Sequence, residues 1–175
     1  MAMVGEKAPE WSSTAFFQGK RKSISHMDYE NQWHVIYWWP FDFAGICNSE
    51  VHGFQLLYER FLSINVRVIG VSCDSFFSHE QWFKSQSFNN MTRPTHPIVA
   101  DNNHSMTKAF GFYNESMGCA YRATVLVAPD REIKSLSVNH LPVARDPRDI
   151  LVTAQGFVSG KLCSLPIRQK LSGML

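Results

Sequence analysis

The sequence has no excess of charge of either sign. Its 175 residues include 17 Lys and Arg against 15 Asp and Glu, so the formal net charge is only +2. Nucleic acids and anionic membrane surfaces are bound by strongly basic patches. A chain with this balance is therefore expected to bind neither nucleic acid nor membrane.

Long apolar runs and flexible linkers are also absent. The longest strongly apolar stretch, Val35 to Trp39, stops at Pro40 and is far shorter than the roughly 20 residues that cross a bilayer. The chain starts with MAMVGEKAPE, which is charged where a secretory signal would be apolar. No repeat or Gly/Ser-rich segment divides it. We expect one globular domain and a cytoplasmic location.

Cysteine is scarce, with four residues at positions 47, 73, 119 and 163. Because 45% of the chain is hydrophobic, it can build a core that needs no disulfide staples. No Cys-x-x-Cys or His-x-x-x-His spacing occurs, so no metal site and no dithiol oxidoreductase site is expected. In a reducing compartment such cysteines are more often buried, metal-bound or catalytic than crosslinked.

Apolar patterning predicts strands and helices in alternation. Short runs of β-branched and aromatic residues predict buried strands over residues 34–39, 67–72, 97–100, 123–128 and 133–138. Apolar residues at three- and four-residue steps, with capping signals, predict helices over residues 49–63, 78–86 (capped by Ser78), 105–110 and 147–158. The basic run at residues 20–22, beside Gly19, is interpreted as a solvated turn. The order predicts an α/β domain with a mixed central sheet and helices on both faces.

One loop lies where such folds bind ligands. Residues 39–51 leave the first buried strand at its carboxyl end and carry Cys47 into the first turn of a helix. The unpaired amide groups of a first turn favour a thiolate, so the pKa of Cys47 is expected to be lowered. The alternative is that Cys47 is one more small buried hydrophobe.

The same loop resembles a known family. Residues 40–47 read Pro-Phe-Asp-Phe-Ala-Gly-Ile-Cys and are followed by Glu50, which resembles the cysteine loop of the peroxiredoxins, usually Pro-x-x-x-Thr/Ser-x-x-Cys. Five further segments resemble the typical two-cysteine, alkyl hydroperoxide reductase C-like (AhpC/TSA) branch in register: VGEKAPEW, VIGVSCDSFFSHEQW, PIVAD, AYRATVLVAPD and VNHLPVARDPRDIL. The resemblance runs from Val4 to about Cys163 and implies a thioredoxin-like fold.

The resemblance also implies a reaction. The protein would be a thiol-dependent peroxidase that reduces hydrogen peroxide or organic hydroperoxides. Cys47 would attack one peroxide oxygen and become a sulfenic acid. Arg122, in AYRAT, would hold the thiolate ionised through a charge that arginine does not lose. Pro40 would shield the loop, while Glu50 and Arg145 would support the local polar network.

Cys163, in GKLCSL, resembles the family's resolving cysteine. It would attack the sulfenic acid of a partner subunit and give an intersubunit disulfide, although a reaction within one subunit stays open. The domain would then cover residues 1–160, with a tail at residues 161–175 that carries this thiol. Cys73 and Cys119 are interpreted as packing residues.

Partners follow from the same resemblance. A homodimer is expected, extended to a ring of dimers, with the aromatic residues Phe41, Phe43 and Phe76 either at interfaces or in the core. Electrons would come from a thioredoxin-like or flavoprotein disulfide reductase. No cofactor is implied.

Ala44 departs from the family pattern. The residue three positions before the cysteine usually carries a hydroxyl that bonds the peroxide, and alanine has none. One lost transition-state hydrogen bond corresponds to roughly 2.7 to 4 kcal/mol, or about a hundred- to a thousandfold in rate. Water, backbone or the hydroxyl of Ser49 could replace it. The alternative function is therefore a catalytically weakened peroxiredoxin that acts as a chaperone-like ring or a slow peroxide sensor.

Overall fold

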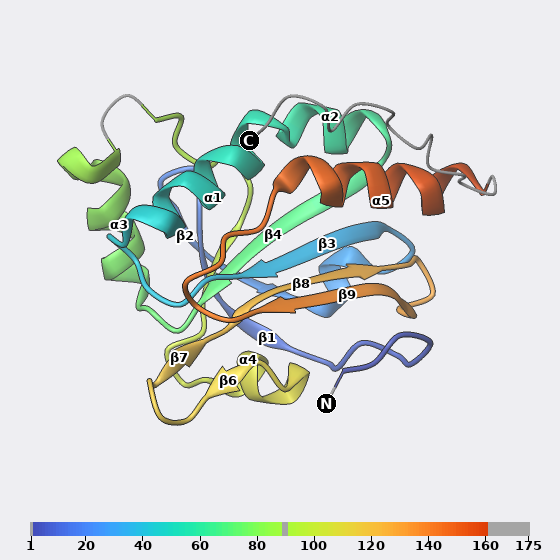
Figure 1. Cartoon of the computed structure of the whole chain (residues 1–175), viewed down its shortest axis with the longest axis horizontal. Coiled ribbons are helices and arrows are strands. Elements are labelled where there is room, and N and C mark those ends of the chain that lie inside the picture. The colour runs from blue at the N-terminus through green and yellow to red at the C-terminus, as the bar shows by residue number, and fades with distance from the viewer. Residues whose placement is uncertain (1, 89–90, 161–175) are drawn as a thin grey trace, which may run out of the picture.

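A mixed sheet of seven strands organises the molecule, in the order β2-β1-β5-β4-β3-β8-β9 (Figure 1). The computed structural model describes residues 2–88 and 91–160. The three central strands β3, β4 and β5 run parallel; β1 and β8 pair antiparallel with the two edges of this trio, and β9 pairs antiparallel with β8. The strands of this sheet are β1 (Ser12–Phe17), β2 (Lys20–Ser25), β3 (Trp33–Trp38), β4 (Val66–Ser72), β5 (Ile98–Ala100), β8 (Arg122–Val127) and β9 (Ile133–Asn139). A short ribbon of β6 (Tyr113–Asn114) and β7 (Cys119–Ala120) stands apart from it.

Helices cover both faces of the sheet. One core contains apolar residues of α1 (Gly45–Leu56), α2 (Tyr58–Ser63), α3 (Phe76–Lys84) and α5 (Pro147–Ser159). The core on the opposite face contains Met106 and Phe110 of α4 (Ser105–Phe110). Figure 1 shows α1, α2 and α5 on one side of the strands and α4 on the other. Two 3₁₀ turns, η1 (His26–Tyr29) and η2 (Gln86–Phe88), complete the set, and none of the described helices is long and apolar enough to span a bilayer.

Strand β3 connects the two cores because its side chains alternate between the faces of the sheet. Val35 and Tyr37 pack into the core under α1, while Ile36 and Trp38 pack into the core under α4. Beside it, Gly70 of β4 lies opposite Tyr37, and a Cβ atom there would come within 3.0 Å of ring atoms of Tyr37 and Trp39. Glycine is therefore required at this crossing of aromatic rings.

The predicted α/β class, with a mixed sheet and helices on both faces, is confirmed. The predicted strands and helices all occur, with shifts at their ends. The basic run at residues 20–22 is not a turn but the exposed start of β2, an edge strand that has no apolar alternation to reveal it. The segment 161–175 lies outside the described residues.

Two helix boundaries differ from the expectation. The helix predicted over residues 49–63 begins at Gly45 and is interrupted at Leu57, which separates α1 from α2. The cap of α3 is Ser75 rather than Ser78, because the Ser75 hydroxyl accepts the Ser78 amide at 3.2 Å.

Candidate active site

Cys47 lies in the first turn of α1, as predicted, and its side chain is fully buried. The helix starts where the chain leaves the sheet: β3 ends at Trp38, a loop follows, and Ala44 is the residue before the helix. The amide of Asn48 donates to the Ala44 carbonyl at 2.9 Å and closes the first helical turn around the cysteine. The sulfur therefore sits at a helix amino end that is enclosed by protein.

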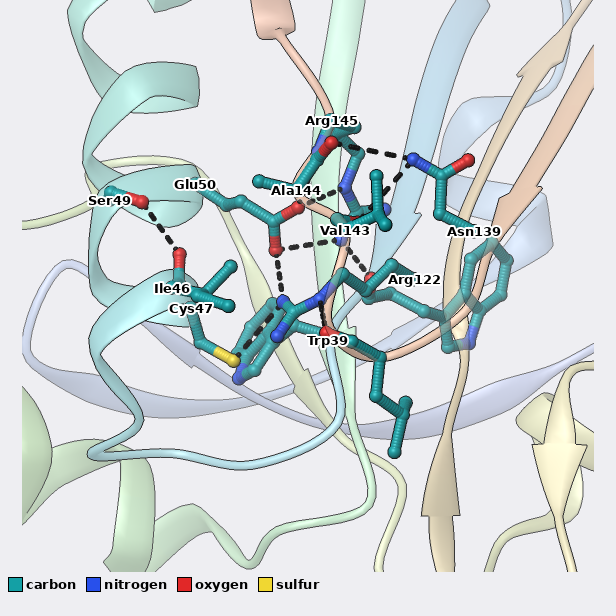
Figure 2. Close-up of polar contacts among 12 residues, drawn as sticks. Trp39, Ile46, Cys47, Ser49, Glu50, Arg122, Asn139, Val143, Ala144 and Arg145 are labelled. Atoms are coloured by element: carbon teal, nitrogen blue, oxygen red, sulfur yellow. Dashed lines mark hydrogen bonds and ion pairs between the residues drawn. The ribbon is translucent and has the colours of Figure 1, made fainter.

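Arg122 is brought directly to this sulfur. It is the first residue of β8, and its side chain is 3% exposed. Its Nη1 atom lies 3.4 Å from the Cys47 sulfur, and its Nε donates to the Leu141 carbonyl at 2.6 Å (Figure 2). The second bond fixes the guanidinium plane, so that one nitrogen points at the thiol.

Glu50 joins this arginine to a second one. It lies one helical turn after Cys47, and its Oε2 accepts from Arg122 Nη1 at 2.6 Å. Its Oε1 accepts from the backbone amide of Arg145 at 2.9 Å and from Nε of Arg145 at 3.1 Å. Figure 2 shows the carboxylate between the two guanidinium groups. The two guanidinium groups that donate to this buried carboxylate compensate for its removal from water.

Arg145 anchors the cluster to the sheet. It comes from the loop between β9 and α5, and it donates to Thr124 Oγ1 at 3.1 Å and to the carbonyl groups of Ala123 and Trp38. The buried cluster then holds two guanidinium charges against one carboxylate. A thiolate at Cys47 would bring it to neutrality.

The expected lowering of the Cys47 pKa is wrong for this closed structure. Burial raises the pKa of the Cys47 thiol, while hydrogen bonds from the Phe41 backbone and from Arg122 lower it, and the charge of Glu50 raises it. The net direction is upward. The partial positive charge of the helix amino end favours a thiolate, but it does not outweigh the loss of water around a fully buried sulfur.

Ala44 leaves the start of α1 without a side-chain cap. Ser49 does not replace the missing hydroxyl in this arrangement, since its side chain is exposed and donates to the Ile46 carbonyl at 2.8 Å (Figure 2). Pro40 is buried between β3 and the cysteine loop. The structure thus brings Cys47, Arg122, Glu50 and Arg145 together around one sulfur.

A second polar network beside the loop was not predicted. Asp42 accepts from Nδ1 of His79 and from the Ser78 hydroxyl, each at 2.8 Å, and from the Trp39 indole at 3.1 Å. Its backbone amide donates to Asp74 at 3.0 Å. These residues lie within the quoted motifs, but periodicity carries no signal for polar partners that meet across the fold.

Cys119 and Cys73 make none of the hydrogen bonds described for this cluster. Cys119 is fully buried, and Cys73 is half-buried with its sulfur 3.8 Å from Thr107 Oγ1. Burial raises the pKa of Cys119 to about 11 and that of Cys73 to about 12. Within residues 2–88 and 91–160 no three metal-ligating side chains gather. Cys163 lies outside the described residues, so its place near Cys47 stays a prediction.

Comparison with known proteins agrees with this geometry. Residues 4–136 match the AhpC/TSA family. The chain is 30% identical over 157 residues to peroxiredoxin prdx-2 of Caenorhabditis elegans, covering 89% of this chain and 78% of that protein. It is 33% identical over 153 residues to peroxiredoxin 1 of Brugia malayi, covering 86% and 67%.

The fold has solved counterparts. The crystal structure of Enterococcus faecalis AhpC superposes with a TM-score of 0.85 at 26% identity, covering 94% of this chain and all of the other. AhpC of Mycobacterium tuberculosis gives a TM-score of 0.83 at 26% identity, covering 94% and 97%. The thioredoxin-like fold that the cysteine loop implied is thereby confirmed. From its sequence matches, its sheet and the cysteine at the start of α1, the chain belongs to the AhpC/TSA family of peroxiredoxins.

Proposed function

We propose that the protein is a thiol-dependent peroxidase in which Cys47 reduces hydrogen peroxide or organic hydroperoxides. The observation that carries the proposal is the 3.4 Å contact between Arg122 Nη1 and the Cys47 sulfur, inside a buried cluster of two guanidinium groups and one carboxylate. The thiolate attacks one peroxide oxygen, the O–O bond breaks, and the departing alkoxide or hydroxide takes a proton. Cys47 is left as a sulfenic acid. Arg122 stabilises the negative charge that moves from sulfur to the leaving oxygen.

The supporting residues have separate roles in this proposal. Glu50 and Arg145 hold Arg122 in place without touching the peroxide. Pro40 is buried at the entrance to the loop and shields the thiolate from water. Ala44 offers no hydroxyl, so the peroxide depends on Arg122 and on the unpaired amides of the first helical turn.

Turnover requires a second thiol and a reductant. In the proposed cycle the Cys163 thiol attacks the sulfenic sulfur of a partner subunit, an S–S bond forms and water leaves. A thioredoxin-like or flavoprotein disulfide reductase then reduces the disulfide. Family membership supports these two steps, disulfide formation and its reduction. A cytoplasmic location would suit the reduced state of Cys73 and Cys119.

A homodimer, extended to a ring of dimers, is part of the proposal. The loop residues Phe41 and Phe43 are 39% and 49% exposed, and Phe77 on the neighbouring α3 is 67% exposed. Exposed aromatic side chains of this size suit an interface between copies. Phe76, the third aromatic residue expected at an interface, is half-buried and packs against Phe16 instead.

A second function is favoured by two observations. Ala44 lacks the hydroxyl, and burial raises the pKa of Cys47, so less thiolate is present at neutral pH. Both features lower the rate of the first step. A slow peroxide sensor, or a ring with chaperone-like binding, is the alternative.

Rapid mixing with peroxide tests the proposal. The natural chain should consume hydrogen peroxide, Cys47→Ser should consume none, and Cys73→Ser should match the natural chain, because its sulfur lies outside the charged cluster. Equal rates for the natural chain and Cys47→Ser would refute the peroxidase. A peroxide-dependent crosslink on a non-reducing gel, lost in Cys163→Ser, would support resolution between subunits.

A further inference from the structure

A buried hydrogen bond joins helix α3 to the first turn of α1. The indole nitrogen of Trp82 donates to Oδ1 of Asn48 at 2.6 Å, and the two residues are 0% and 7% exposed. Asn48 follows Cys47 in the chain, and its amide makes the bond to the Ala44 carbonyl that closes the turn. The bond to Trp82 therefore acts on the residue that completes the enclosure of the cysteine.

The indole has little freedom to follow Asn48 if the turn opens. Aromatic rings surround it: the centroid of Trp39 lies 5.8 Å away, that of Phe88 5.2 Å and that of Phe83 4.9 Å. Trp82 is thus fixed by the core, and Asn48 is the partner that would have to leave. Separation would bury an indole N–H without this acceptor, which costs free energy.

While the first turn of α1 is closed, Cys47 cannot form a disulfide with a second cysteine. A disulfide needs two sulfur atoms at about 2.05 Å with their Cβ atoms about 3.8 Å apart. No second thiol can approach a fully buried Cys47 while Arg122 and the helical turn enclose it. The first turn of α1 must open before the sulfur of Cys47 can bond to another cysteine.

We propose that Asn48 and Trp82 form a latch that keeps Cys47 enclosed and slows the transfer of its oxidised sulfur to a second thiol. The inference rests on the proposed function and deepens it. In the step that the latch slows, the sulfenic acid Cys47–SOH and a thiol R–SH give Cys47–S–S–R and water. Asn48 and Trp82 are positioning residues: they touch neither the peroxide nor the incoming thiol, and they set how often the turn is open.

A disulfide reagent measures the opening without any peroxide. Below saturation, the rate at which Cys47 reacts with 5,5′-dithiobis(2-nitrobenzoate) is proportional to the population of the open turn. The thiolate displaces one nitrothiobenzoate and keeps the other as a mixed disulfide, and mass spectrometry of the Cys47 peptide separates this reaction from those of other cysteines. Rates are divided by the thiolate fraction of each variant.

Trp82→Phe should raise this normalised rate about tenfold, which corresponds to about 1.4 kcal/mol at 25 °C. Asn48→Ala removes the same bond from the other side and should do likewise, and it carries the test if Trp82→Phe does not fold. The effect of the double variant should be smaller than the sum of the two single effects, because both substitutions remove the same hydrogen bond. Trp38→Phe is the matched control, since Trp38 is equally buried and its indole nitrogen has no hydrogen-bond partner among the described residues.

The latch is refuted if Trp82→Phe and Trp38→Phe accelerate the reagent equally, or if the effects of Trp82→Phe and Asn48→Ala simply add. A peroxide arm links the latch to turnover: Trp82→Phe should shorten the time during which dimedone traps Cys47–SOH and speed disulfide formation by a similar factor. If no sulfenic acid forms in the natural chain, the peroxidase proposal fails, and the reagent arm still decides on the latch.

Discussion

Nη1 of Arg122 lies 2.6 Å from Oε2 of Glu50, and the same nitrogen is the one aimed at the Cys47 sulfur. One guanidinium nitrogen thus serves a carboxylate and a thiol at once. The carboxylate orients the arginine but also opposes the ionisation of the thiol, because its negative charge raises the pKa of Cys47. Glu50 therefore fixes the position of Arg122, and it offsets part of the effect of the arginine's positive charge on the pKa of Cys47.

Glu50→Gln should separate these two effects. Loss of the negative charge should lower the pKa of Cys47, because Glu50 is one of the groups that raise it. The same change leaves Arg122 and Arg145 buried without their carboxylate, which should cost about 3–5 kcal/mol of unfolding free energy. Thiolate absorbance against pH and denaturant titration measure the two changes.

The control is Glu80→Gln, which removes a carboxylate from a partly exposed pair with Lys84 and should change stability by less than about 1 kcal/mol. A rise in the pKa of Cys47 in Glu50→Gln would contradict the assigned role.

The peroxide reaction should accelerate as the pH rises past the ordinary range for a thiol. Burial raises the pKa of Cys47 and only the thiolate attacks, so the midpoint of the rate against pH should lie above the ordinary thiol value. A plateau already reached at neutral pH would show that the prediction is wrong.

The same shift has a consequence for stability. A thiol whose pKa is raised in the folded state contributes stability that is present below its unfolded pKa and is lost as the pH rises through the folded pKa. Denaturation of the natural chain and of Cys47→Ser at several alkaline pH values should therefore converge as the pH increases.

Ala44→Ser should improve both the helix and the reaction. A serine before the first helical residue can accept an unpaired amide of α1, which is worth about 1 kcal/mol. If its hydroxyl also bonds the peroxide, the rate should rise about a hundred- to a thousandfold. Stopped-flow peroxide consumption and thermal unfolding measure the two gains.

Ala109→Ser, on the exposed side of α4, controls for the added hydroxyl and should change neither quantity. A stability gain without a rate gain would mean that another group already serves the peroxide, and it would remove the main argument for a weakened enzyme.

Two fully buried histidines should carry different charges at pH near 6. The ring nitrogens of His79 face Asp42 and the Val99 carbonyl, which only accept, so both must donate. Burial alone would lower the pKa of His79, but the Asp42 carboxylate outweighs it and the pKa is raised above 6.5. His96 bonds Tyr37 and Gln55, and burial lowers its pKa to about 3.

Nitrogen-15 spectra of the imidazole rings should show His79 doubly protonated and His96 neutral at pH near 6. The pairing of His79 should stabilise the fold fully below pH 6.5, with the contribution lost as the pH rises through its raised pKa. A neutral His79 at pH near 6 would contradict the assignment.

Much of the fold could be predicted from the sequence, because buried strands are marked by continuous runs of apolar residues. The run through Val35, Ile36 and Tyr37 is apolar on both faces, which is typical of a central strand. Strand β2 was missed because its residues at positions 20–22 are charged and exposed, and only the pairing with β1 makes them a strand. Edge strands are specified by their neighbours more than by their own residues.

The site was predictable in its members but not in its electrostatics. The family resemblance predicted roles for Cys47, Arg122, Glu50 and Arg145. The fold brings their side chains together. The direction of the Cys47 pKa depends on how completely the chain encloses the sulfur, which no local pattern encodes. The bond between Asn48 and Trp82 joins residues 34 positions apart and is visible only once α3 is packed.

Gly70, at the centre of the sheet, is connected to the cysteine loop through the aromatic rings beside it. The rings of Tyr37 and Trp39 occupy the space that a larger residue would need, and the indole of Trp39 in turn holds Asp42 at the start of the loop. A methyl group added at Gly70 would meet the Trp39 ring, and a shift of that ring would move the donor to which Asp42 is bonded. A substitution deep in the sheet can therefore alter the geometry of the cysteine loop without any contact with Cys47.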